Sequence, residues 1–246
     1  MTDIASHRGG AALWPENSEI AFRETVKLGV EQIEFDVQLS ADGVPVIFHD
    51  ATLDRVTDGT GPLAAQTLAE LKALNIFRGG GRIMTLDEGL EILAPSHLIL
   101  RCEIKPSGDL IPYPGIVDKV LAAVIRHGLV DRTVLTSFHL PTLRAVLDRV
   151  APLSDVIWLV SDQIARLTSP AHVATLAAAE GVGAVSLHHR ILDGEALATL
   201  RGAGLRVGAF GVLEDAAIAK VLQQGVTVFT TDRPDAALRL RAALGA

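Results

Sequence analysis

The sequence predicts an α/β fold, a (β/α)8 TIM barrel with one extra antiparallel hairpin strand after the second barrel strand. Short β-branched runs alternate with longer segments of helical period, as in βα units around a parallel sheet. The chain has 246 residues, a length that suits an α/β barrel. No linker or low-complexity stretch interrupts the pattern, so we expect residues 1–246 to form a single domain.

The strands are predicted from runs rich in β-branched and apolar residues. These runs are Ile4–Ser6, Gln32–Val37, Val44–Phe48, Leu98–Ile104, Thr133–Thr136, Val156–Val160, Ala184–Leu187, Leu205–Phe210 and Thr227–Thr230. They are one too many for the barrel. The segment between the second and third runs ends in Asp42-Gly43, which is typical of a tight hairpin, and is too short for a crossover helix. We therefore expect Val44–Phe48 to return antiparallel, which leaves eight parallel strands.

The segments between the strands have helical start and stop signals. We expect Asn17 to cap a helix that ends at Gly29, and Asp193 to begin another. Pro234 stands at the first-turn position of the last predicted helix. Residues 51–82 have the least regular pattern, and we expect them to form loops over the mouth of the barrel.

Charge and composition exclude several classes of protein. The 22 Lys and Arg against 29 Asp and Glu give a net charge of -7, which lacks the positive excess that nucleic acid or an anionic membrane surface demands. The only cysteine, Cys102, fits a reducing compartment. There is no export-signal pattern, and no apolar run approaches the ~18 residues that span a bilayer. We expect a cytoplasmic protein without nucleic-acid partner or stable membrane association; a homo-oligomer is neither predicted nor excluded.

Two carboxylates in the second strand indicate a metal site. In such a barrel the strand interiors are apolar and chemistry collects where strands end, so charged residues there are informative. Glu34 and Asp36 are two residues apart and lie on the same face of the strand. Buried carboxylates side by side repel each other, and a divalent cation with oxygen ligands removes that conflict. The alternative is an outward-facing pair bound to a helix, which is disfavoured because helices cover that face.

Glu103 and Lys105 repeat this spacing at the end of a later strand. If Glu103 joins Glu34 and Asp36, three carboxylates surround one site, and Lys105 points the same way beside a bound anion. A plain ion pair between Glu103 and Lys105 is the alternative.

His7 and His49 are the candidates for proton transfer, since both follow strands and imidazole titrates near neutral pH. A lone histidine at such a position is more often structural. Here Arg8 follows one and Asp50 the other, which favours an acid/base pair. The planar guanidinium of Arg8 suits a phosphate or a carboxylate. A metal site, two cationic anion binders and two imidazoles together indicate metal-assisted phosphoryl chemistry.

A series of motifs runs through the chain from about residue 4 to about residue 236. They are Ser6-His7-Arg8-Gly9-Gly10, Pro15-Glu16-Asn17-Ser18, Glu34-Phe35-Asp36-Val37, Asp42-Gly43, His49-Asp50, Leu53-Asp54-Arg55, Glu103-Ile104-Lys105-Pro106, Ser137-Phe138 and Thr231-Asp232. In order and spacing they resemble the signature of the glycerophosphodiester phosphodiesterases. The compact length is similar to that of the cytoplasmic bacterial members.

The resemblance implies hydrolysis of glycerophosphodiesters, such as glycerophosphocholine or glycerophosphoethanolamine, to sn-glycerol 3-phosphate and an alcohol. It implies a divalent metal, usually Mg²⁺ with Ca²⁺ or Mn²⁺ as alternatives, held by Glu34, Asp36 and Glu103. It also implies that His7 and His49 are general base and acid, and that Arg8 and Lys105 bind the phosphate. The glycerol 2-hydroxyl of the substrate would attack phosphorus, and water would then open the resulting cyclic phosphate.

One departure from the family pattern and two other functions stay open. Many relatives carry Trp-Thr-Val-Asn on the seventh strand, where this chain has Phe210-Gly211-Val212-Leu213, so the substrate range is undetermined. A metal-dependent aldolase or isomerase would use the same carboxylates, but the paired histidines and cations favour the phosphodiesterase. A non-catalytic protein that binds glycerophosphodiesters would need neither an acid nor a base.

Overall fold

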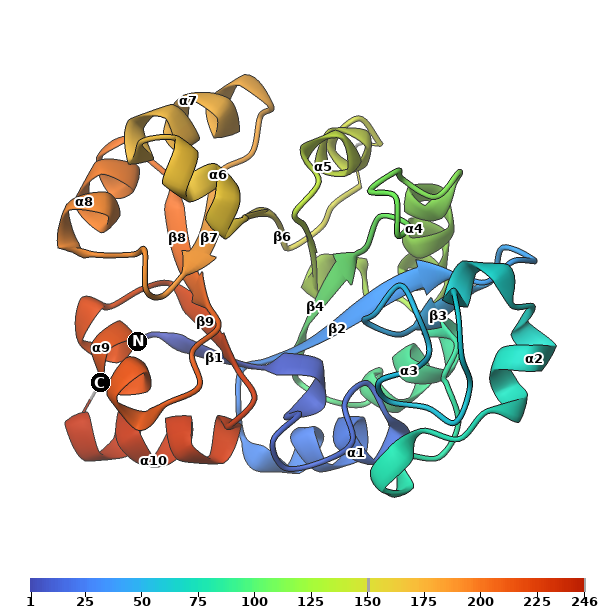
Figure 1. The fold of residues 1–246 in the computed structure, drawn as a ribbon. Helices are drawn as coiled ribbons and strands as arrows, with labels where there is room; N and C mark the ends of the chain where they lie inside the picture. Colours follow the sequence, from blue (N-terminus) through green and yellow to red (C-terminus); the bar gives the residue numbers. More distant parts are fainter. Residues whose placement is uncertain (150, 246) are drawn as a thin grey trace.

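The computed structural model describes residues 1–149 and 151–245, which form a barrel of parallel strands surrounded by helices (Figure 1). The barrel strands are β1 (Asp3–Ser6), β2 (Gln32–Leu39), β4 (Ile99–Ile104), β5 (Thr133–Ser137), β6 (Asp155–Val160), β7 (Ala184–His188), β8 (Arg206–Phe210) and β9 (Val228–Thr231). Strand β1 pairs in parallel with both β2 and β9, and this double pairing closes the ring. The predicted TIM barrel is therefore confirmed.

The extra hairpin strand is β3 (Pro45–Ile47), which pairs antiparallel with β2 outside the ring. In the turn between them, the Gly43 amide donates to the Ser40 carbonyl over 2.9 Å. Gly43 has φ 75, a left-handed conformation that costs glycine little. The strand is one residue shorter than predicted at each end; at its start, the Val44 amide donates to the Ser40 hydroxyl within the turn.

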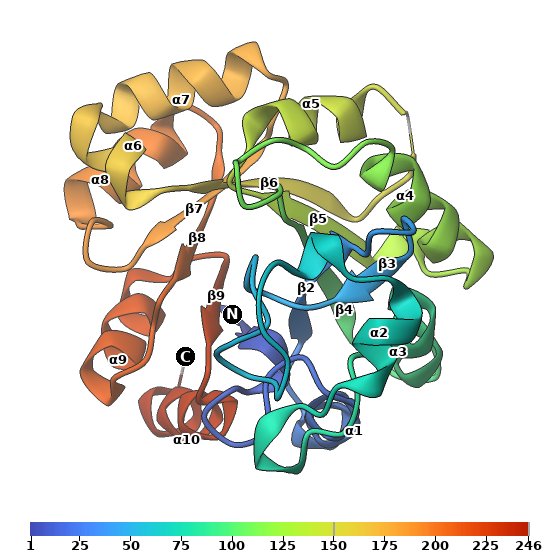
Figure 2. The same cartoon turned by 45° about the vertical axis from the view of Figure 1, so that its right-hand side comes forward.

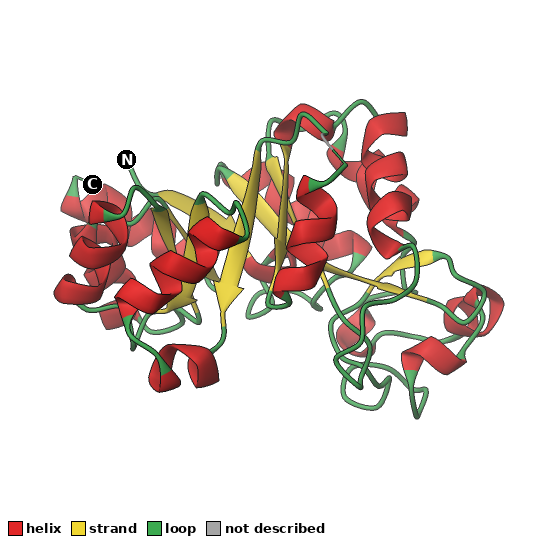
Figure 3. Cartoon of the chain, turned by 90° about the horizontal axis from the view of Figure 1, so that it is seen from above, coloured by secondary structure: helices red, strands yellow, loops and turns green. Residues whose placement is uncertain are grey.

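Helices follow the strands and cover the outside of the barrel, as Figures 2 and 3 show. They are α1 (Glu19–Leu28), α3 (Leu86–Leu93), α4 (Ile116–Arg126), α5 (Leu140–Leu147), α6 (Asp162–Leu167), α7 (Pro170–Ala179), α8 (Gly194–Gly202), α9 (Asp215–Gln224) and α10 (Pro234–Leu244). Gly29 ends α1 in the left-handed conformation, Asp193 caps α8, and Pro234 begins α10, all as predicted. Within the described ranges, none of these helices has the length and apolarity needed to cross a membrane.

The predicted cap of α1 is wrong by one residue. Ser18, not Asn17, is the N-cap, and its hydroxyl accepts from the Ala21 amide over 3.2 Å. Asn17 has φ 54, so its backbone stands outside the extended conformation of a cap residue. Its side chain instead donates to Asp36 inside the barrel over 2.8 Å.

The segment 51–82, predicted as loops, is partly helical. It contains α2 (Leu68–Ala73) and the 3-10 turns Leu63–Ala65 and Phe77–Gly79. Thr67 and Glu70 form a capping box at the start of α2. A second apolar cluster beneath these turns consists of Val46, Phe48, Leu53, Leu63, Leu71, Ile76 and Ile83. The segment is therefore packed onto the hairpin strand β3 rather than left as open loops.

The main core lies between the barrel strands and the helices. Alternate residues of β2, Ile33, Phe35 and Val37, are fully buried in this layer. Phe35 packs against Phe22 of α1, with ring centroids 5.5 Å apart. Because side chains alternate along a strand, the residues between them project into the barrel. Packing of the apolar face thus directs Glu34 and Asp36 inward.

Candidate active site

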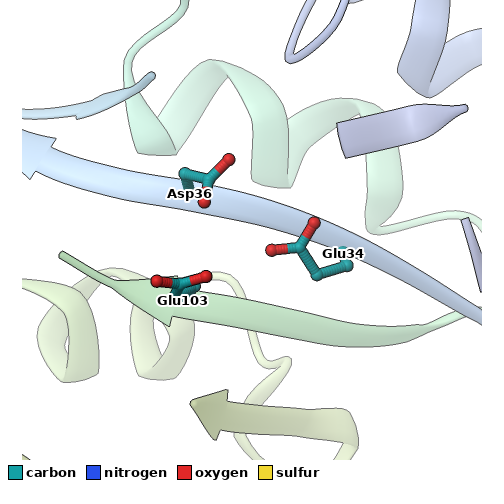
Figure 4. A group of neighbouring side chains, drawn as sticks. All are labelled: Glu34, Asp36 and Glu103. Carbon is teal, nitrogen blue, oxygen red and sulfur yellow. The ribbon is translucent and has the colours of Figure 1, made fainter. Parts of the chain in front are cut away.

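Three carboxylates converge inside the barrel, as Figure 4 shows for Glu34, Asp36 and Glu103. One oxygen from each lies within 4.8 Å of the other two. Glu34 and Asp36 come from β2 and Glu103 from β4, and Asp36 stands beside Glu103 in the parallel register. All three side chains are buried. The alternative in which the first two face outward to a helix is therefore wrong.

Lys105 is the cation closest to this carboxylate cluster. Its Nζ lies 2.7 Å from Glu103 Oε1 and 3.0 Å from Asp36 Oδ1. Burial alone would raise the pKa of Asp36, but the charges of Lys105, His49 and Arg8 outweigh burial and hold this pKa below its usual range. Burial and the neighbouring Asp36 raise the pKa of Glu34 to about 7. The ion pair between Glu103 and Lys105, which was the alternative interpretation, is present, but as part of the carboxylate cluster.

The donor set fits a divalent cation. Three buried carboxylates this close together repel one another, and oxygen ligands of this type suit Mg²⁺, Ca²⁺ and Mn²⁺. Among the described residues, Asp36 Oδ1 is buried and receives no hydrogen bond, although Lys105 Nζ lies 3.0 Å away as an ion-pair partner. A bound cation would satisfy this oxygen and offset the repulsion.

His7 is oriented by a carboxylate from the opposite end of the chain. It begins the 3-10 turn His7–Gly9 after β1, and its Nδ1 lies 2.5 Å from Asp232 Oδ1 just after β9. Its Nε2 lies 3.8 Å from Glu34 Oε2. Burial opposes protonation of His7, but Glu34 and Asp232 outweigh it, so its pKa is raised. The free Nε2 thus faces the carboxylate cluster.

His49 has the same arrangement with a different carboxylate. Its Nδ1 lies 2.6 Å from Asp50 Oδ1. Asp50 is held in turn by Arg55, which also donates two hydrogen bonds of 2.7 Å to Glu16. Burial lowers the pKa of His49, and the attraction of Asp36 does not offset it. The two imidazoles are therefore both fixed through Nδ1 but differ in proton affinity.

Arg8 and Asn17 contact the carboxylate cluster, and both residues have a strained backbone conformation. Their φ angles are 49 and 54, in the left-handed region that non-glycine residues rarely adopt. The Arg8 amide donates to Glu34 over 3.0 Å, and its Nη1 donates to Glu16 over 2.9 Å. Such strain persists only where surrounding contacts enforce it, and it is common at functional sites.

A cavity of about 200 Å³ connects these groups. Six of the seven predicted site residues line it, namely His7, Arg8, Glu34, His49, Glu103 and Lys105. Asp36 lies behind them. The opposite wall is more apolar and includes Phe138, Leu159 and Phe210. A larger open groove of about 700 Å³ contains none of the predicted site residues.

Sequence reasoning assigned no role to Asp232, Glu16 or Arg55. The position of Asp232 in the sequence could have indicated a site residue, because Asp232 directly follows the last strand and residues at that end of a strand lie at the mouth of the barrel. Its partner could not be read from the sequence. Glu16 and Arg55 belong to quoted motifs, but their mutual contact depends on how two loops fold over the mouth.

The family model for glycerophosphoryl diester phosphodiesterases matches residues 7–236. The chain belongs to this family. A glycerophosphodiester phosphodiesterase of Caldanaerobacter subterraneus is 38% identical over 157 residues, which span 61% of this chain and 63% of that protein. Another, of Bacillus altitudinis, is 31% identical over 253 residues and 98% of each chain. The predicted glycerophosphodiester phosphodiesterase family and enzyme class are therefore confirmed.

Solved structures agree with this membership. A crystal structure from Agrobacterium tumefaciens assigned to the glycerophosphoryl diester phosphodiesterases has a TM-score of 0.96 and 37% identity, and the match covers 100% of this chain and 99% of that one. An Oleispira antarctica phosphodiesterase in complex with the product sn-glycerol-3-phosphate has a TM-score of 0.80 and 25% identity over 100% and 98% of the two chains.

Proposed function

We propose that this chain hydrolyses glycerophosphodiesters, such as glycerophosphocholine and glycerophosphoethanolamine, to sn-glycerol 3-phosphate and an alcohol. One observation carries the proposal: Glu34 and Glu103 of the buried carboxylate cluster line the same cavity as two imidazoles, each of which is fixed by another carboxylate. The product bound to the Oleispira antarctica relative supports the same substrate class. An aldolase or a simple binding protein would not require this pair of oriented imidazoles.

Glu34, Asp36 and Glu103 would hold the divalent ion, Mg²⁺ first, with Ca²⁺ or Mn²⁺ as alternatives. When bound, such an ion stabilises the negative charge that develops on the phosphoryl oxygens. Arg8 and Lys105 line the same cavity and add positive charge toward these oxygens. Arg8 is held in place by its hydrogen bond to Glu16.

His7 would act as the general base. Asp232 accepts a hydrogen bond from the Nδ1–H of His7, so Nε2 is the atom that takes the proton of the glycerol 2-hydroxyl. That oxygen attacks phosphorus and forms the cyclic phosphate as the bond to the alcohol breaks. Glu34 is one of the charges that raise the pKa of His7, so its charge would be offset and the neutral imidazole favoured when Glu34 holds a cation.

His49 would act as the general acid. Asp50 stabilises the protonated imidazole through Nδ1, and burial lowers the pKa of His49, so the proton is readily given to the leaving alkoxide. Water then opens the cyclic phosphate with the two roles reversed, and sn-glycerol 3-phosphate results. The attack is intramolecular, so the substrate itself supplies a positioned nucleophile.

Phosphorus NMR of glycerophosphocholine incubated with the protein and Mg²⁺ tests this function. We expect sn-glycerol 3-phosphate to appear, to stop forming with EDTA, and to fall sharply in His7→Ala and His49→Ala. His172→Ala is the matched control, because His172 is an exposed residue of α7 that does not line the cavity and whose side chain forms a hydrogen bond with the helix cap Ser169. Undiminished turnover after chelation would contradict the metal site, and parent-like rates in both active-site variants would contradict the acid/base roles.

A further inference from the structure

Arg101 is a charged residue inside the barrel that the proposed reaction does not use. It lies on β4 two residues before Glu103, so both side chains project into the barrel, and it stands beside Glu34 in the register of β2 and β4. Its side chain is only 2% exposed. The interior layers of such barrels consist mostly of branched apolar side chains. A guanidinium in this layer is costly and needs an explanation.

The Arg101 guanidinium has little local compensation. Its Nε donates to Gln32 Oε1 over 3.3 Å. Across residues 1–149 and 151–245, its other nitrogens make no hydrogen bond, and no carboxylate oxygen lies within 4.0 Å of it. Burial lowers the pKa of Arg101 to about 10, so the group remains a cation at neutral pH.

Arg101 separates two cavities. It lines the floor of the 200 Å³ cavity and also a cavity of about 100 Å³ at the opposite end of the barrel. In that lower cavity Asp155 already forms an ion pair with Arg206 at 2.6 Å. Asp3 accepts from Gln32 rather than from Arg101. The charge of Arg101 is therefore directed mainly at the carboxylate cluster, where Glu34 stands beside it.

A formal charge count shows what this cation does. Three carboxylates, Lys105 and a divalent ion sum to zero, and the charge of Arg8 is offset by Glu16. Asp232 beside His7 adds a further negative charge, so without Arg101 the formal charges around the cavity disfavour an anionic phosphodiester. Arg101 shifts the sum by one positive charge. The same charge repels the divalent ion, so its two effects have opposite signs.

We propose that Arg101 is a positioning residue of the phosphodiesterase site, whose buried charge weakens cation binding by the carboxylate cluster and strengthens binding of the phosphate ester in the loaded cavity. The inference rests on the proposed metal site. It predicts that neutralising Arg101 tightens one ligand and loosens the other. A residue needed only for packing would loosen both.

Two titrations test the inference. Mn²⁺ is titrated calorimetrically into metal-free protein, and sn-glycerol 3-phosphate is then titrated into the Mn²⁺-loaded protein. For Arg101→Met we expect Mn²⁺ to bind on the order of tenfold tighter and sn-glycerol 3-phosphate on the order of tenfold weaker. Arg101→Lys retains the charge and is expected to keep both affinities within about twofold of the parent.

Arg144→Met is the matched control, because it removes an arginine of α5 whose side chain is 55% exposed and pairs with Asp148, and which lines neither cavity. It should leave both affinities unchanged.

Weaker binding of both ligands in Arg101→Met, or no change in either, would overturn the inference. If that variant does not fold, Arg101→Gln, which also removes the charge, takes its place with the same expected results. If the parent binds no Mn²⁺, the proposed metal site fails as well, whereas a parent that binds Mn²⁺ confines any failure to Arg101.

Discussion

Replacing Asp232 by Asn tests whether its contact with His7 determines the tautomer of the imidazole. An ionised carboxylate only accepts hydrogen bonds, so the 2.5 Å contact places the proton on Nδ1 and leaves Nε2 free. Asn keeps the size of the side chain, but its amide can donate to Nδ1. That contact favours the tautomer with the proton on Nε2, which cannot act as a base.

The size of the effect follows from two contributions. A hydrogen bond to a charged group is worth about 1.5–3 kcal/mol, and each ~1.4 kcal/mol corresponds to a tenfold change in rate. Lost orientation alone therefore lowers kcat about 10- to 100-fold. Where the wrong tautomer prevails, as in triads whose acid is replaced by Asn, the loss reaches on the order of 10⁴-fold. We expect a fall between these limits.

The assay is steady-state hydrolysis of glycerophosphocholine at saturating Mg²⁺, with Mn²⁺ affinity measured in parallel. Asp232 is not one of the clustered carboxylates, so the Mn²⁺ affinity should stay within about twofold of the parent. Asp235→Asn is the control, since Asp235 pairs with Arg239 on α10 away from the cavity. A kcat within about threefold of the parent for Asp232→Asn would refute the orienting role.

Three further changes test the site and the fold. Glu103→Gln removes one clustered carboxylate, so calorimetry should show Mn²⁺ affinity lowered by at least about tenfold, and an unchanged affinity would contradict the metal site. Phe22→Ala should lower the free energy of unfolding in urea by about 3–5 kcal/mol, whereas Phe77→Ala, at an exposed position, should change it by less than about 0.5 kcal/mol. Glu31→Gln should cost about 1–3 kcal/mol at pH 7, because Arg241 binds this carboxylate. Burial opposes ionisation of Glu31, but Arg241 outweighs it and lowers its pKa in the folded protein. This difference should therefore begin to shrink below pH about 4, where the unfolded chain takes up the proton first, and disappear as pH falls through the lower pKa of the folded state. A difference that persists in strong acid would contradict the ion pair.

Local patterns predicted the features that depend on a few neighbouring residues. The two-residue spacing of Glu34 and Asp36 placed both carboxylates on one face, and the Asp42-Gly43 turn identified the hairpin strand. The six-residue helix α2 (Leu68–Ala73) was missed because it is too short to show a helical period.

Features that depend on distant parts of the chain could not be predicted in this way. The contact between His7 and Asp232 exists only because β1 pairs with β9. Ser18 rather than Asn17 caps α1, because the side chain of Asn17 donates its hydrogen bond to the buried carboxylate of Asp36. In each case tertiary contacts, rather than local preference, decided the structure.

The closure of the ring between β1 and β9 also sets an order for the appearance of activity during synthesis. The three clustered carboxylates are complete once residue 103 has been added, so the groups proposed to bind the metal precede most of the barrel. The orienting partner of His7 arrives only with residue 232 and reaches it only when the last strand docks. A nascent chain with the earlier strands in place would thus hold a cation before it could turn over a substrate, and completion of the fold and onset of catalysis would be the same event.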